Sequence, residues 1–100
     1  MQSSVSGNRS VRARNLLFFA RPDLWPAWPF LPLVKRWPDR PHEYGVLFDA
    51  MGSHDLPGYS ATVFLTNMFL MPRQLDELLA LPREVFDTCD ELADTGWCVD

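Results

Sequence analysis

The chain of 100 residues has few of the side chains from which disulfide or metal scaffolds are built. It contains two cysteines, Cys89 and Cys98, and two histidines, His42 and His54. Two cysteines do not make a disulfide framework, and the spacing of the four residues matches no structural zinc pattern. We therefore expect neither a metal nor a cofactor. Such cysteine usage makes a reducing, cytoplasmic location the default expectation.

Long apolar runs and glycine-rich loops are also missing. No segment reaches the roughly 18 consecutive apolar residues typical of a membrane span. The segment 16–20 is too short for the apolar region of a signal peptide, and Arg21 interrupts it. The five glycines are scattered without a Gly-x-Gly cluster, so the sequence predicts no phosphate-binding loop. We expect no membrane association.

Positive charge is scarce in the second half of the chain. Residues 1–43 carry seven Lys and Arg against three Asp and Glu, whereas residues 44–100 carry two against ten. The halves therefore bear +4 and −8, which gives the net charge of −4. An acidic half of this size repels a phosphate backbone, so nucleic-acid binding is an unfavoured function.

The composition is that of a globular protein. Apolar residues make up 47% and charged residues 22% of the chain, and 100 residues is the length of one domain. Residues 1–14 are rich in Ser, Asn, Gly and Arg and predict a disordered N-terminal tail. We expect residues 15–100 to form a single α+β domain.

The longest apolar run, Ser60–Met71, predicts the central strand of a sheet. Its polar members scatter around a helix, whereas both rows of a period-two pattern are mostly apolar. A strand that is apolar on both faces is normally covered on both. A buried helix of the same length stays the alternative, because periodicity alone does not separate the two.

Shorter segments complete the predicted sheet. Residues 31–37 and 44–50 predict two further strands, and Gly45 marks a bulge or a close backbone approach. Residues 15–20 form either a short first strand, which is the favoured interpretation, or the entry turn of a helix. Short connections favour an antiparallel meander. The predicted fold is α+β: a small antiparallel sheet of three to four strands, one or two C-terminal helices, and a Pro/Trp-rich strap.

Two helices are predicted after the central run. Pro72 suits a first helical position, and the spacing of Leu75, Leu78 and Leu79 gives an apolar stripe that ends before Pro82. Thr88 followed by Glu91 fits a capping box, and Gly96 fits the left-handed position after a helix. A short terminal strand over 97–99 follows.

The strap lies at residues 21–33, within a region that holds six of the nine prolines between Pro22 and Pro41. Proline removes backbone donors and breaks regular helix. Trp25, Trp28 and Phe30 are either core residues beneath the strap or an apolar surface for a protein partner.

No arrangement of residues predicts a catalytic site. The tripeptide Ser53-His54-Asp55 has the letters of a hydrolase triad, but a triad is assembled from separated positions. The loop at residues 52–59 could nevertheless line a small pocket. Its candidate ligand-binding residues are Asp49, His54, Tyr59 and Asn67.

Three function classes remain open. The favoured one is a non-enzymatic interaction module that binds a protein partner, or a second copy as a homodimer, through the strap or a sheet edge. The alternative is a small ligand-binding or hydrolytic domain with a pocket near residues 52–59. The third is an adaptor to an acidic partner through the N-terminal arginines together with Lys35, Arg36 and Arg40.

Overall fold

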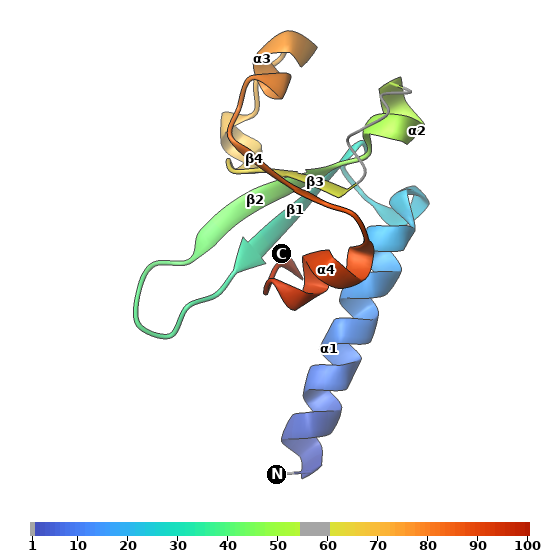
Figure 1. The fold of residues 1–100 in the computed structure, drawn as a ribbon, viewed down its shortest axis with the longest axis vertical. Helices are drawn as coiled ribbons and strands as arrows, with labels where there is room; N and C mark the ends of the chain where they lie inside the picture. The colour runs from blue at the N-terminus through green and yellow to red at the C-terminus, as the bar shows by residue number, and fades with distance from the viewer. Residues whose placement is uncertain (1, 55–60) are drawn as a thin grey trace.

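The computed structural model describes residues 2–54 and 61–100, with side chains described from residue 10 to 52 and from 61 to 100. Within these ranges the fold is a mixed α/β arrangement of a five-stranded sheet, four α-helices and two short 3₁₀ helices (Figure 1). In chain order the elements are α1 (Gln2–Ala20), η1 (Pro22–Leu24), β1 (Phe30–Lys35), β2 (Glu43–Phe48), α2 (Ala50–His54), β3 (Ala61–Phe64), η2 (Met68–Leu70), α3 (Leu75–Leu79), β4 (Arg83–Phe86), α4 (Cys89–Asp94) and β5 (Cys98–Val99).

All strand pairs of the sheet are antiparallel, in the order β4-β3-β2-β1-β5. The strands β1 to β4 therefore form the predicted meander, and β5 returns from the end of the chain to pair with β1. The strand count exceeds the predicted three to four. Residues 83–86, for which no strand is predicted, join the sheet as β4, and the short terminal strand predicted over 97–99 joins it as β5. The edge strands are β4 and β5.

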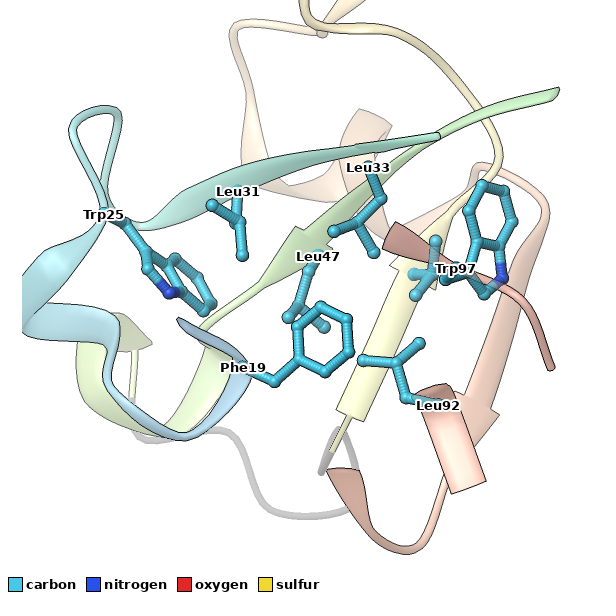
Figure 2. Close-up of a cluster of buried hydrophobic side chains, with 8 residues drawn as sticks. Phe19, Trp25, Leu31, Leu33, Leu47, Leu92 and Trp97 are labelled. Atoms are coloured by element: carbon cyan, nitrogen blue, oxygen red, sulfur yellow. The ribbon is translucent and has the colours of Figure 1, made fainter. Parts of the chain in front are cut away.

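One face of the sheet carries the larger core. Alternate strand residues such as Leu31, Leu33, Leu47 and Val63 point to this face, where α1 and α4 cover them. Figure 2 shows Phe19 of α1 and Leu92 of α4 converging on these side chains, with Trp25 and Trp97 at opposite ends of the cluster. Burying such aliphatic and aromatic groups contributes about 1.5–3 kcal/mol each.

The opposite face carries a second cluster, centred on Phe48, Phe64 and Leu78. The ring of Phe48 lies 5.2 Å from that of Phe30 and 5.9 Å from that of Phe64, measured between centroids. Leucines 75, 78 and 79 of α3 pack here, so the predicted leucine stripe covers one face of the sheet. Its start differs from the prediction, since α3 begins at Leu75 behind the N-cap Gln74 rather than at Pro72.

The run Ser60–Met71 forms an interior strand, but only over four residues. Strand β3 covers Ala61–Phe64, is fully buried, and pairs with β2 on one side and β4 on the other. The expectation of a strand to Met71 is wrong, because the chain bends at 65–66 and turns into η2. The Asn67 carboxamide ends the strand: its Oδ1 accepts hydrogen bonds from Phe69 N and Leu70 N.

Residues 2–20 form one helix, which corrects the predicted first strand at 15–20. Arg12, Asn15 and Phe19 lie on the side of α1 that meets the domain. Arg12 donates to Asp94 at 2.7 Å and to Asp90 at 3.3 Å, which links this part of α1 to α4. The docking side mixes one charged, one amide and one aromatic residue, and so lacks the apolar period of an amphipathic helix. The division of the chain at residue 14 stays a prediction.

The predicted N-cap at Thr88 and the left-handed Gly96 are confirmed, whereas the Glu91 side chain of the predicted capping box accepts from Asp87 N instead of Thr88 N. Thr88 Oγ1 accepts a hydrogen bond from Glu91 N at 3.1 Å, and Glu91 Oε2 accepts one from Asp87 N at 2.9 Å. Gly96 has φ of +99° and ends the last helix. The chain then reverses so that β5 pairs with β1.

Trp97 lies across the large core face and is 1% exposed. Its Nε1 donates to Glu84 Oε1 at 2.9 Å, and Lys35 Nζ lies 4.6 Å from the ring centroid. Gly45 makes this position possible: a Cβ there would lie 3.0 Å from the indole and 2.6 Å from Val63 Cγ1. The close backbone approach predicted at Gly45 is thus the place where the Trp97 indole packs against the strand.

We expect Gly45→Ala to destabilise the protein by about 1–3 kcal/mol, because overpacking must displace the indole or Val63. Thermal and urea unfolding measure the loss. Combined with Val63→Ala, which removes the nearest methyl group, the cost should be smaller than the sum of the two single changes. Strict additivity would show that a Cβ at position 45 does not press on Val63.

Candidate functional site

The three residues proposed as a partner-binding strap separate in the structure. Trp25 is core, with its Nε1 donating to Phe18 O at 2.6 Å. Phe30 belongs to β1 and stacks on Phe48. Trp28 is 49% exposed. They therefore do not form one continuous apolar patch, and the irregular segment is shorter than predicted, since η1 occupies 22–24 and β1 begins at residue 30.

The Asp49 carboxylate accepts two hydrogen bonds that fix the local structure. Its Oδ1 accepts a hydrogen bond from Gly52 N at 3.0 Å, the pattern of a cap at the start of α2. Its Oδ2 accepts one from Trp28 Nε1 at 2.9 Å. One carboxylate therefore holds the start of α2 against the turn that precedes β1.

Asn67 lines an open cavity of about 420 Å³ on the face of the sheet opposite the large core. Tyr44, Met68 and Phe69 are among its apolar lining residues, and Asp100 is the charged one. Phe69 is 98% exposed beside it. Asn67 Oδ1 already accepts two backbone hydrogen bonds at the start of η2. A ligand would have to compete with these bonds for the carbonyl oxygen.

The four residues predicted to bind a ligand are not shown together. Asp49 follows the last residue of β2, whereas Asn67 lies beyond the other end of the β2–β3 pair. The side chain of His54 and all of Tyr59 lie outside the described residues, as does most of the predicted loop at 52–59. A pocket at that loop therefore stays a prediction.

The outer edge of β4 presents backbone groups to its surroundings. Leu65 N donates to Pro82 O at 2.9 Å, which makes Leu65 and Pro82 a hydrogen-bonded pair. The same register places Thr62 opposite Val85. Hydrogen-bonded and non-hydrogen-bonded pairs alternate along an antiparallel ladder, so Glu84 and Phe86 bond to β3. The N–H and C=O of Val85 consequently point away from the sheet, and no described element pairs with them. The Val85 side chain is 49% exposed.

The other edge of the sheet is closed. Strand β5 has only two residues. Its Val99 N–H, which points outward by the same alternation, donates to Oδ1 of the buried Asn15 in α1 at 3.0 Å. Short strands and covering elements are the usual protection of sheet edges. Of the two edges, β4 is the one with an outward amide that no described side chain covers.

The basic and aromatic residues near the β1–β2 connection are engaged with one another. The Arg40 guanidinium carbon lies 4.0 Å from the Trp37 ring centroid, and Trp37 Nε1 donates to Glu43 Oε2 at 3.0 Å. Lys35 faces Trp97. The positive charges proposed for an acidic partner are therefore distributed over different contacts instead of forming one patch.

Cys89 stands at the first position of α4 and is partly buried against the large core. Burial, and to a smaller extent the carboxylate of Asp90, raise the pKa of the Cys89 thiol above its ordinary value. A raised pKa keeps the thiol protonated at neutral pH, and the protonated form is a poor nucleophile. The environment thus opposes a catalytic role for this residue.

Among the described residues, no three His, Cys, Asp or Glu side chains gather closely enough to hold a metal ion. None of the described helices is long and apolar enough to cross a membrane. Comparisons with protein families, curated proteins and solved structures found no match to this chain. The site is therefore interpreted from its own geometry, in which β4 and the Asn67 cavity are two open surfaces of the described residues.

The sequence pattern named Asn67 and a sheet edge in general, but it did not indicate that β4 is that edge or that Tyr44 and Phe69 lie beside Asn67. Residues 83–86 are an extended segment of ordinary composition, and only the strand order makes them an edge. Phe69 and Tyr44 belong to segments that predict buried strands. Their exposure follows from the bend after β3, which no periodic signal marks.

We expect alkylation of Cys89 by iodoacetamide near pH 8 to be slower in the folded protein than in the urea-unfolded chain, because the raised pKa lowers the thiolate fraction. The rate is measured in a Cys98→Ser background by mass spectrometry. Asp90→Asn should increase the folded-state rate by removing one cause of the shift. A folded protein that reacts as fast as the unfolded chain would contradict the raised pKa.

Proposed function

We propose that the protein is a small non-enzymatic interaction module that binds an extended segment of a protein by strand addition at the outer edge of β4. The observation that carries the proposal is the outward N–H and C=O of Val85 on an edge strand that no described element pairs with. Main-chain hydrogen bonds supply affinity in this binding mode, and alternate side chains supply specificity.

The surroundings of Val85 suit an added strand. The rest of β4 is held firmly: Glu84 is tied to Trp97, and the start of α4 is capped by Thr88. A rigid template lowers the ordering cost of binding, since only the incoming segment loses freedom. The Val85 side chain offers an exposed apolar contact next to the unpaired amide. The strap plays no part in this proposal, because Trp25 and Phe30 are held within the domain.

A library of extended peptides tests strand addition. Selected peptides should shift the amide resonances of β4 and lose binding to Val85→Pro, which removes the outward N–H. Because Pro is tolerated at outward positions of an edge strand, Val85→Pro should keep its fold, whereas Glu84→Pro removes an inward ladder bond and should lower the melting temperature.

Val85→Ala is the matched control, since it shortens the same side chain and keeps the amide. Peptides that bind Val85→Pro as well as the wild type, or that map elsewhere on the domain, would rule out strand addition at β4. A library that yields no binder to the wild type in either monomeric or self-associated form would do the same.

Binding of an apolar small molecule is the second candidate, supported by the Asn67 cavity. Its volume of about 420 Å³ falls within the range of about 300–1,000 Å³ usual for ligand sites. Tyr44 and Met68 give it apolar walls, and Phe69 stands at its rim. This site lies away from the predicted loop at 52–59, and Asn67 is the residue that it shares with the predicted set.

An NMR screen of aromatic and aliphatic fragments tests this candidate. Fragments that bind should shift the resonances of Tyr44 and Met68. Phe69→Ser should lower their affinity severalfold, because it removes apolar contact area. Leu17→Ser is the control, because Leu17 is an exposed apolar residue on α1, outside the cavity. Equal effects of the two changes would indicate unspecific adhesion to apolar surface and exclude the site.

A further inference from the structure

We infer that the segment that adds to β4 is the same strand of a second copy of this chain, paired antiparallel about a two-fold axis at Val85. This inference rests on the proposed strand addition and names its partner. Two five-stranded sheets would become one continuous sheet, with the closed β5 edges at its two ends.

The register follows from the outward groups. Residues 83, 85 and 87 alternate with the inward 84 and 86, so a self-paired strand places Val85 opposite Val85 of the second copy. The two valines then exchange both of their backbone hydrogen bonds. The Asp87 N–H is already bonded to Glu91 Oε2, which ends the ladder one residue beyond the axis on either side.

The charges on the strand are complementary under this two-fold rotation. With Val85 on the axis, Arg83 of each copy lies opposite Asp87 of the other, and both side chains are exposed. Opposite charges that face one another across antiparallel strands stabilise the pairing. Arg83 Nη1 donates to Leu79 O at 2.9 Å, which steadies the side chain. Because a guanidinium stays positively charged whichever hydrogen bonds it makes, it still attracts the Asp87 carboxylate across the strands.

A peptide partner would not need this symmetry, whereas a self-paired strand does. Two-fold interfaces use the same surface on both copies, and every contact occurs twice. Arg83 and Asp87 stand at equal distances along the chain from Val85 with opposite charge. The strand is short, so we expect a weak dimer whose population depends on protein concentration.

Charge reversal gives the sharpest test. In Arg83→Glu the cross-axis pair becomes two carboxylates, and in Asp87→Arg it becomes two guanidiniums. Each variant alone should therefore dimerise about tenfold more weakly than the wild type. An equimolar mixture of the two should form a heterodimer, because each carboxylate of the first variant then faces a guanidinium of the second. Sedimentation equilibrium of each variant and of the mixture measures the association.

Melting temperatures of both variants show whether the fold is retained. If Arg83→Glu fails to fold because the contact to Leu79 is lost, Val85→Cys provides an independent test. Across the axis the two Cα atoms are about 5.5 Å apart in a hydrogen-bonded pair, which is within disulfide reach. Mild oxidation should cross-link this variant as a dimer, whereas the wild type, which keeps Cys89 and Cys98, serves as the control.

The outcomes separate this inference from the proposed function. A wild type that stays monomeric at every concentration, yet binds library peptides along β4, overturns self-pairing and leaves strand addition in place. A dimer that persists in Val85→Pro overturns both, because another surface then holds the copies together. A dimer that is lost in Val85→Pro but unaffected by either charge reversal overturns the two-fold register at Val85.

Discussion

The packing of Trp97 over Gly45 connects the parts of this fold. The indole belongs to the end of the chain, the glycine to the second strand, and the Glu84 carboxylate that accepts the indole N–H to the edge strand β4. One side chain thus joins three segments that are far apart in sequence. A buried ring of this size supplies a large burial term, and its polar N–H is satisfied within the same contact. The ammonium group of Lys35 lies over the Trp97 ring.

The same contact shapes the surface from which we infer function. The side chain of Glu84 is held by Trp97 while its N–H and C=O bond to β3, and the alternation along the strand turns the amide of Val85 outward. Thr88 and Glu91 fix the chain directly after β4. At the opposite edge, the outward N–H of Val99 donates a hydrogen bond to the side chain of Asn15. The sheet is therefore closed at the β5 edge, whereas no described element pairs with the outer edge of β4.

Short-range sequence signals correctly predicted the features that depend on short-range interactions. The N-cap at Thr88, the left-handed Gly96 and the leucine stripe at 75–79 depend on neighbours within one or two turns, and each is present as predicted. The run from Ser60 failed after Phe64 because Asn67 offers its side chain to the backbone, a local competition that hydrophobic alternation does not register. The set of candidate ligand residues stays a prediction, and of its members Asp49 and Asn67 serve as caps at opposite ends of a strand pair.

The amino-acid sequence by itself determined the α+β class, the antiparallel meander of the first strands, and the need to cover both faces of the strand at Ala61–Phe64. Apolar alternation, turn residues and capping side chains encode these features within short windows. Tertiary structure alone decided which helices supply the cover, that Trp25 is buried while Trp28 is exposed, and that β4 is an edge. These depend on the order of strands and on contacts such as Arg12 with Asp94, which join residues that no local pattern links.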